Sequence, residues 1–395
     1  MPVECPPQPA TPTQAALAAD GARWPIVQSA ILAWYRAHAR VLPWRAPPGA
    51  NARTDAYHVW LSEIMLQQTT VAAVAPYFVR FTTRWPTLAD LAAADPADVL
   101  AAWAGLGYYS RARNLLACAG VVMRDHGGQL PADHGQLRAL PGVGDYTAAA
   151  IAAIAFGLDA VPVDANIERV VARLCAIDAP LPGARRAIRA AAAALWPHDG
   201  SGGDFAQALM DMGARLCTAR APNCGECPVA QHCRAHALGV AAALPVKPAR
   251  RPRPHRVGRA SAIVQRGTDG VARIWLVRRP PRGLLGGMRA LPGGDWVAVA
   301  DDGPAPAPLS ISPSASPFAP PPVADLPPGT RTLGPVRHVF THFSLDLWVD
   351  ILPDATRAVG EGEWWPIVTL DGAGLPTLYR HASTLIEQAI EPGER

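Results

Sequence analysis

Apolar residues recur at spacings of three and four positions through the first half of the chain. The spacing is clearest in residues 26–35, 57–81 and 167–174. Side chains three and four positions apart share one face of a helix, so each stretch predicts a helix with a buried face. Residues 145–156, rich in Ala and Ile, predict another helix. The first half therefore predicts an all-α domain.

The pattern changes in the second half. Residues 260–265, 272–277 and 343–352 are rich in β-branched and aromatic residues without a helical period, which predicts strands. Residues 381–390 predict a final helix. We expect a smaller, mixed α/β domain here.

Composition places the boundaries between these regions. Residues 1–22 have little pattern and predict a disordered tail, and residues 301–330, mostly Pro, Ala, Ser and Gly, predict a disordered insertion. Between the domains the chain is rich in Pro and Arg and has no acidic residue, which is typical of a linker. The predicted segments are a tail at 1–22, a helical domain at 23–240, a linker at 241–258 and an α/β domain at 259–395.

The chain has 395 residues, of which 50% are hydrophobic and 17% charged, with a net charge of +4. This length is enough for two or three domains, and the mild charge alone does not demand a nucleic-acid partner. Lys247 is the only lysine. Arginine binds phosphates bidentately, but a GC-rich genome explains the same bias.

Cysteine usage and apolar run lengths predict a cytoplasmic protein without a membrane span. The N-terminus has no apolar core of a signal peptide, and the longest apolar run, residues 147–158, is too short to cross a bilayer. The cysteines number seven, and four of them are close together. This arrangement fits a metal site in a reducing compartment better than disulfides.

A glycine-rich segment, Leu140-Pro-Gly-Val-Gly-Asp145, joins two helical patterns. Gly142 and Gly144 predict a tight hairpin with positive φ. A helix that starts after such a hairpin directs its N–H groups and positive dipole end outward, where a phosphate can bind. Asp164 follows at the start of the next helical stretch. A phosphate anchor close to a carboxylate predicts chemistry on a nucleic acid.

The clustered cysteines have the spacing C-x6-C-x2-C-x5-C. They are Cys217, Cys224, Cys227 and Cys233. Four thiolates in one short segment fit an iron–sulfur cluster or a structural zinc ion, and the spacing alone does not choose between them.

The hairpin, Asp164 and the cysteine segment resemble the helix-hairpin-helix DNA glycosylases of the endonuclease III superfamily. Within that superfamily the chain resembles the MutY-type adenine DNA glycosylases, from about Trp24 to the C-terminus. The resemblance implies an all-α glycosylase domain with a [4Fe–4S] cluster on the loop 217–233. It also implies a C-terminal α/β Nudix-like domain.

The segment Leu61-Ser-Glu-Ile-Met-Leu-Gln-Gln-Thr69 resembles the part of MutY proteins that carries the catalytic acid. Glu63 has apolar neighbours, so desolvation would raise its pKa and keep a proton available. Without the resemblance, a glutamate on a solvated helix face is the simpler interpretation. With it, we expect Glu63 to donate a proton to N7 of adenine.

Asp164 then faces the sugar, where it stabilises or captures the oxocarbenium ion, as in glycosidases. An aspartate before an apolar helix is also a common N-cap, and the two roles are compatible. Tyr146 and Asn166 match supporting positions around the carboxylates. Bifunctional relatives carry a lysine at the position of Tyr146, so we expect base removal without an efficient lyase step.

Further residues match family positions that contact DNA or the lesion. Leu106 and Tyr108 match a packing residue and a wedge that help to extrude the base. Core packing is the alternative for Tyr108 and for Phe340. The complete set of expected DNA- and lesion-binding residues is Gln68, Thr69, Leu106, Tyr108, Gly142, Gly144, Phe340, Thr341 and His342. The glutamate-rich Nudix hydrolase motif is missing from the sequence, so pyrophosphate hydrolysis is not expected.

We therefore expect a monomeric base-excision-repair enzyme that removes adenine opposite 8-oxoguanine or guanine in double-stranded DNA. One alternative is a thymine or uracil mismatch glycosylase, which would normally lack the C-terminal domain. The other is a non-catalytic iron–sulfur DNA-binding protein.

Overall fold

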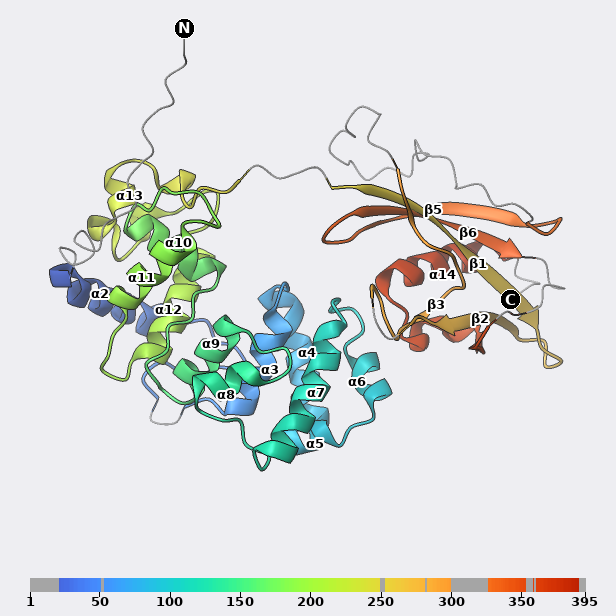
Figure 1. Ribbon diagram of the computed structural model, residues 1–395, viewed down its shortest axis with the longest axis horizontal. Coiled ribbons are helices and arrows are strands. Elements are labelled where there is room, and N and C mark those ends of the chain that lie inside the picture. Colours follow the sequence, from blue (N-terminus) through green and yellow to red (C-terminus); the bar gives the residue numbers. More distant parts are fainter. Residues whose placement is uncertain are drawn as a thin grey trace, which may run out of the picture. The chain divides into compact units, whose positions relative to one another are not determined.

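The computed structural model describes residues 21–50, 53–248, 253–280, 283–299, 326–352, 358 and 360–390 (Figure 1). The chain divides into two compact units, Met1–Pro96 with Ser110–Ala249 and Ala97–Tyr109 with Arg250–Arg395. The tail predicted at 1–22 and the insertion predicted at 301–330 lie outside the described residues, except for 21–22 and 326–330.

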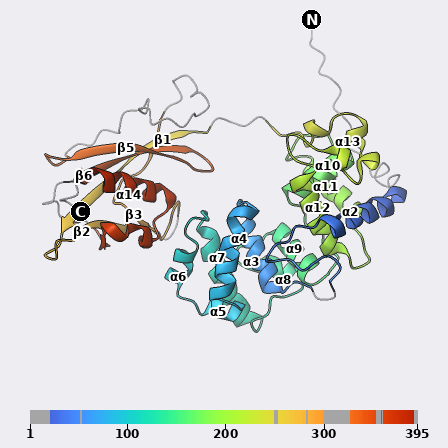
Figure 2. The same cartoon turned by 180° about the vertical axis from the view of Figure 1, so that it is seen from behind.

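The first half of the chain is helical, as predicted (Figures 1 and 2). Its longer helices are α2 (Trp24–His38), α3 (Ala56–Leu66), α4 (Val71–Arg84), α5 (Leu88–Ala92), α6 (Pro96–Ala102), α7 (Ser110–Asp125), α8 (His134–Ala139), α9 (Asp145–Ala155), α10 (Ala165–Leu174), α11 (Arg185–Leu195), α12 (Gly202–Arg215) and α13 (Arg234–Ala237). Single 3₁₀ turns are η1 (Gly21–Arg23), η2 (Cys224–Glu226), η3 (Ala230–His232) and η4 (Ala241–Ala243).

The stretch predicted to be helical at 57–81 is helical, and it forms two helices, α3 and α4. The chain breaks at Gln68, which has a left-handed φ of +57°. Thr70 then caps α4, because its hydroxyl accepts a hydrogen bond from the Ala73 amide at 3.3 Å. This break creates a short turn directly after the helix that carries Glu63.

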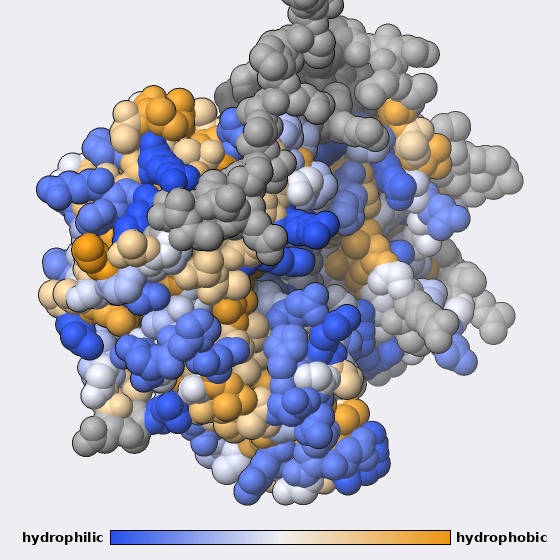
Figure 3. Space-filling model, turned by 60° about the vertical axis from the view of Figure 1, so that its left-hand side comes forward, coloured by the Kyte–Doolittle hydropathy of each residue, from blue (hydrophilic) through white to orange (hydrophobic). Residues whose placement is uncertain are grey.

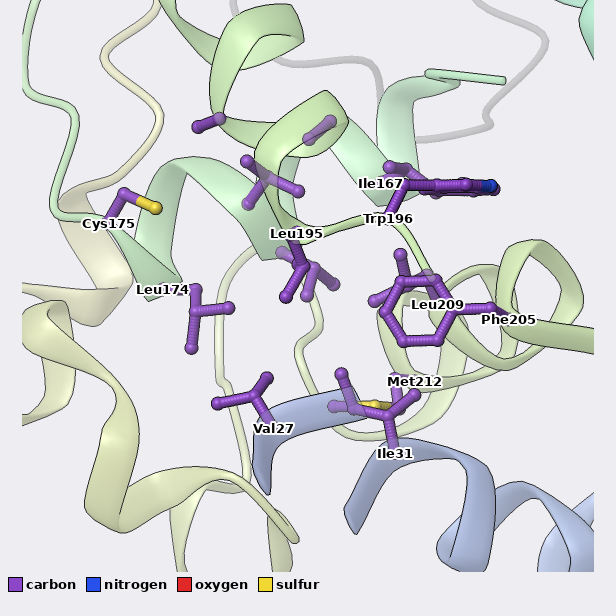
Figure 4. Packing of buried hydrophobic residues seen from close by; sticks show 14 of the residues in the cluster. Val27, Ile31, Ile167, Leu174, Cys175, Leu195, Trp196, Phe205, Leu209 and Met212 are labelled. Carbon is purple, nitrogen blue, oxygen red and sulfur yellow. The ribbon is translucent and has the colours of Figure 1, made fainter. Parts of the chain in front are cut away.

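One hydrophobic core of the first unit lies between α2, α10, α11 and α12. Trp196 and Phe205 meet edge to face with ring centroids 5.3 Å apart. Figure 4 shows these two rings beside Ile167 and Leu209. This core packs against one side of α10 and holds the helix rigidly. Asp164, the N-cap of α10, is therefore held in a fixed place.

The second unit is built on a mixed sheet in the order β3-β2-β1-β6-β5, with β4 paired to β1 and β7 to β2. β1 and β6 are parallel, and the other pairs are antiparallel. The strands are β1 (His255–Arg266), β2 (Ala272–Arg278), β3 (Arg289–Ala290), β4 (Val297–Ala298), β5 (Arg331–Val339), β6 (Ser344–Leu352) and β7 (Gly362–Pro366).

Helix α14 (Thr377–Ala389) packs its apolar side on this sheet, after the 3₁₀ segment η5 (Ile367–Ala373). Its buried residues Leu378, Tyr379 and Ile386 join the core formed by Ile274 and Leu347 from the strands. The strands predicted within 260–265, 272–277 and 343–352 and the helix predicted at 381–390 are present, which confirms the mixed α/β class.

The segment predicted as a linker, 241–258, is structured at both ends. Leu244 packs in a small core, and its carbonyl accepts a 2.8 Å hydrogen bond from Arg173. At the other end β1 begins at His255, and Val257 and Ala260 of this strand are buried.

The surface seen in Figure 3 is mainly polar, with scattered apolar residues. No helix in the described part of the chain combines the length and hydropathy needed to cross a bilayer.

Candidate active site

Glu63 lies on α3, a helix that is apolar on nearly every side. Asp55 caps the helix by accepting a 2.7 Å hydrogen bond from the Tyr57 amide. Burial leaves Glu63 only 7% exposed, and this desolvation raises the pKa of its carboxyl to about 7. The Tyr146 hydroxyl donates a hydrogen bond to the Glu63 carboxylate and lowers that pKa, while the charge of Asp164 raises it. At neutral pH Glu63 is therefore able both to hold and to release a proton.

Asp164 is the N-cap of α10. Its Oδ1 accepts hydrogen bonds from the amides of Asn166 at 2.9 Å and Ile167 at 2.7 Å, and its Oδ2 accepts one from the Asn166 side chain at 2.7 Å. Burial raises the pKa of Asp164, and these three hydrogen bonds oppose that rise. The carboxylate is thus fixed in direction by the helix it caps.

A cavity of about 830 Å³ brings the two carboxylates together. The residues expected at the site that line it are Glu63, Gln68, Thr69, Tyr146, Asp164 and Asn166. They come from α3, the turn after it, α9 and the start of α10. The cavity is large enough for a purine base. Its two carboxyl groups have different surroundings, because Glu63 has mainly apolar neighbours and Asp164 accepts three hydrogen bonds.

The hairpin between α8 and α9 has the tight turn that was predicted, but only one of its glycines has positive φ. Gly142 has a φ of +76°, and a Cβ there would lie 2.8 Å from the Asn114 Cβ. Gly144 has a φ of −96° and is the N-cap of α9, so the expected positive φ at Gly144 is wrong. Its exposed position leaves the first N–H groups of α9 accessible.

The remaining expected residues do not line this cavity. Leu106 is buried, which fits a packing role, whereas Tyr108 is 43% exposed with a φ of +48°. Phe340, Thr341 and His342 lie in the turn between β5 and β6.

Sequence reasoning missed Arg111 of α7, which supports the turn after α3. Its Nη1 donates to the carbonyls of Ile64 at 3.1 Å and Met65 at 2.7 Å, and its Nη2 donates to Thr69 Oγ1 at 3.0 Å. Arg111 lies in the first turn of α7, and its buried guanidinium satisfies carbonyls that the end of α3 leaves free. Arg111 stands three positions after Tyr108, and nothing else in the local sequence indicates its contacts with α3.

Gln67 and Arg45 were also missed. Gln67 Nε2 lies 3.4 Å from the Gly142 carbonyl and 3.5 Å from Thr147 Oγ1, so it connects the end of α3 to the hairpin. Arg45 lines the cavity, and its charge lowers the pKa of Glu63. The buried carboxylate of Asp211 holds Arg45 through two contacts of 2.9 and 3.0 Å.

Arg169 connects α10 to the cysteine segment. Its Nη2 donates to Asn166 Oδ1 at 2.9 Å and to the Gly213 carbonyl at 2.6 Å, and its Nε donates to the Cys217 carbonyl at 2.7 Å. Gly213 allows this approach, because a Cβ there would lie 2.6 Å from the Asn166 Cβ. The hydrogen bonds around Asp164 therefore extend to the first cysteine.

The four cysteines line one small cavity of about 20 Å³. Among the described residues, no three His, Cys, Asp or Glu side chains are grouped closely enough to serve one metal ion. Four thiols around one shared space fit a centre bound by cysteines alone, either an iron–sulfur cluster or a zinc ion. Arg173 Nη1 donates a hydrogen bond to Cys217 Sγ at 3.2 Å.

Three family models match the chain. Residues 61–198 match the HhH-GPD superfamily of base excision DNA repair proteins, and residues 262–384 match the NUDIX domain. Residues 217–233 match the iron–sulfur binding domain of endonuclease III. The cysteines therefore hold a [4Fe–4S] cluster, and Cys217, Cys224, Cys227 and Cys233 are the residues available to bind it.

Curated relatives and a solved structure agree. An adenine DNA glycosylase of Rattus norvegicus is 36% identical over 91% of this chain and 76% of its own length. One of Mycolicibacterium smegmatis is 43% identical over 53% of this chain and 69% of its own length. The structure of a thermostable thymine-DNA glycosylase matches 56% of this chain and 99% of its own, with 30% identity and a TM-score of 0.50. One cavity holds a buried acid and a second carboxylate, and the family models and relatives agree with it: the chain is a DNA N-glycosylase and belongs to the adenine DNA glycosylases of base excision repair.

Proposed function

We propose that this enzyme removes adenine opposite 8-oxoguanine or guanine and leaves the strand intact. The observation that carries the proposal is the cavity in which Glu63, with a pKa of about 7, and the N-cap carboxylate of Asp164 occur together. The residues of this cavity come from one chain, so a monomer suffices.

Glu63 acts as the general acid. It donates its proton to N7 of the extruded adenine, so that the base departs as a neutral molecule when the bond between N9 and C1′ breaks. The positive charge that develops on the sugar is stabilised, or captured covalently, by the Asp164 carboxylate. Water then adds to C1′, and the proton lost by that water balances the one that Glu63 gave to the base.

Tyr146 and Asn166 support the two carboxylates. The Tyr146 hydroxyl, hydrogen-bonded to Glu63, limits how far the pKa of that acid rises. The Asn166 amide holds Asp164 Oδ2 at 2.7 Å. A tyrosine in this position supplies no amine for a Schiff base, and the only lysine, Lys247, lies in the 241–258 segment.

Residues outside the cavity, together with Gln68 and Thr69 of its lining, bind the duplex and read the opposite base. The N–H groups of α9 after Gly142 and Gly144 bind a phosphate, and Leu106 and Tyr108 support base extrusion. The base opposite adenine is read by Gln68 and Thr69 in the first unit and by Phe340, Thr341 and His342 in the second. Thr341 and His342 are exposed, and each offers a hydrogen-bonding side chain.

A thymine or uracil mismatch glycosylase is the second candidate, because a solved thymine-DNA glycosylase matches the chain. That match covers 56% of the chain, whereas the rat adenine DNA glycosylase covers 91%. The second unit, with its NUDIX-domain match, therefore favours adenine.

The test is a set of duplexes with A:8-oxoG, A:G, T:G and U:G pairs, incubated with the enzyme and analysed with and without alkali. We expect strand breaks at adenine only after alkali, fastest for A:8-oxoG, and none for Glu63→Gln. Borohydride should trap no covalent Schiff-base complex. Cleavage of T:G or U:G alone would overturn the adenine assignment, and efficient nicking without alkali would overturn the absence of lyase activity.

A further inference from the structure

The turn between β5 and β6 presents two exposed polar side chains and is anchored by an aromatic one. The Phe340 amide donates to the Phe343 carbonyl at 2.9 Å and closes the turn. Thr341 and His342 at its tip are exposed, whereas Phe340 is half-buried. The ring of Phe340 is therefore one of the groups that hold the turn.

Three rings surround Phe340. Phe343 and His338 belong to the same hairpin, with centroids 4.8 and 4.5 Å away. Trp296 comes from a different segment, directly before β4, and stacks on Phe340 with centroids 5.5 Å apart and planes inclined by 25°. Trp296 thus ties the hairpin turn to another part of the sheet.

Trp296 is itself held in place. It lies so close to β1 that a Cβ on Gly258 would be 2.4 Å from its Cδ1. The Arg279 guanidinium lies over the indole, 5.3 Å from its centroid. Arg279 in turn donates to the carbonyl of Leu284 and to the hydroxyl of Tyr379, both at 3.2 Å. Because Tyr379 is buried on α14, a continuous chain of contacts runs from the core helix to the turn.

We propose that Trp296 is a positioning residue that determines specificity: it holds the Phe340–Phe343 turn in the shape in which Thr341 and His342 read the base opposite adenine. This inference rests on the proposed reading of 8-oxoguanine by that turn. A turn that is already ordered loses less conformational entropy when it meets its ligand, so it binds more tightly. Of the ring contacts described above, those left to Phe340 without the indole come from its own hairpin. The tip of the turn, Thr341 and His342, is then less restrained.

A purely structural role for Trp296 predicts a different result. Loss of packing alone lowers the stability of the second unit but affects both opposite bases equally. A positioning role changes the ratio of the rates for A:8-oxoG and A:G, because only the former offers the 8-oxo group to the turn.

Trp365 provides a matched control. It lies on β7 in the same unit, with Arg289 over its ring at 4.6 Å, and its Nε1 donates to the Thr369 carbonyl at 3.0 Å. Trp365→Leu therefore removes a comparable arginine–tryptophan contact at a place away from the turn.

The experiment uses the full-length holoenzyme in molar excess over the DNA. It measures single-turnover adenine release from A:8-oxoG and A:G duplexes. Stacking of aromatic pairs predicts that Trp296→Leu lowers the A:8-oxoG to A:G rate ratio about tenfold. The A:G rate itself should stay within about twofold, since an interaction made only with the lesion is lost. Trp365→Leu should keep the wild-type ratio, and Trp296→Phe should retain most of it. Arg279→Met, which leaves every ring in place, should give a smaller loss in the same direction.

A wild-type ratio in Trp296→Leu and Arg279→Met, with a clear preference in the wild type, would overturn the inference alone. Equal loss in Trp365→Leu would also overturn it, since the effect would then be general destabilisation. Equal rates on both duplexes in the wild type would overturn the proposed lesion reading and, with it, this role of Trp296.

Discussion

We expect the Tyr146–Glu63 hydrogen bond to set the pH at which Glu63, the proposed general acid, loses its proton, and Tyr146→Phe tests this directly. The hydroxyl stabilises the charged carboxylate, so it lowers the pKa of Glu63, which burial has raised to about 7. Without the hydroxyl the pKa rises further. Since the acid must be protonated to act, the alkaline limb of the rate profile moves to higher pH.

The size of the shift follows from the strength of the bond. A hydrogen bond to a charged group contributes about 1.5–3 kcal/mol, and one pKa unit corresponds to about 1.4 kcal/mol. We therefore expect the midpoint of the alkaline limb to rise from about 7 by about one to two units. Below pH 6 the variant should be nearly as fast as the wild type, because Glu63 is protonated in both.

The assay is single-turnover adenine release from an A:8-oxoG duplex at saturating enzyme between pH 5 and 10. Tyr57→Phe is the control: its hydroxyl is also buried on α3 but donates to the Trp85 carbonyl at 2.8 Å, so the limb should stay in place. An unchanged limb in Tyr146→Phe, or a shift to lower pH, would refute the assignment of Glu63 as the acid tuned by this tyrosine.

Further predictions concern Glu63, Gly213, Arg111 and Asp164. Glu63→Gln should abolish adenine release yet stabilise the first unit increasingly as the pH rises from 5 to 8. A carboxyl whose pKa goes from 4.5 unfolded to about 7 folded weakens the fold at alkaline pH, by about 3 kcal/mol at pH 8. The free energy of unfolding in urea is compared between Glu63→Gln and the exposed-site variant Glu361→Gln. A difference between these two variants that is the same at every pH would contradict this expectation. Gly213→Ala should push Asn166 away, destabilise by about 1–3 kcal/mol and slow adenine release, whereas Gly120→Ala, which has open space, should not. Arg111→Met leaves two carbonyls of α3 without their donor, so thermal unfolding should show a loss of about 1–3 kcal/mol; an unchanged melting temperature would rule this out. Asp164→Asn should keep the cap, and therefore the melting temperature, but lose adenine release; full activity would remove the carboxylate from the mechanism.

Local features of the chain were predictable where one neighbourhood decides them. The helical period placed α2, α9 and α10, and the apolar neighbours of Glu63 correctly indicated its burial. The N-cap role of Asp164 also followed from the apolar run after it. These properties depend on residues within a few positions of each other.

Features that depend on long-range contacts could not be read in the same way. The break at Gln68 is a left-handed residue without glycine, and the contacts that hold it come from Arg111 on another helix. The bond between Tyr146 and Glu63 joins two helices distant in sequence. β5 follows a Pro-rich stretch, so the sequence did not indicate where this strand begins. The stack of Trp296 on Phe340 forms only once β4 and the β5–β6 turn are folded.

Asp164 both lines the cavity and caps α10, and this combination has a consequence for a variant that loses the charge. Because Asp164 both lines the cavity and caps α10, asparagine at this position preserves the helix start while removing the charge. Such a variant stays folded, so it is not degraded as an unfolded protein would be, and it keeps its DNA-binding surfaces. It would occupy mispairs without processing them and so shield them from functional copies. We therefore expect the asparagine variant to compete with the active enzyme for DNA, which loss of the whole protein would not do.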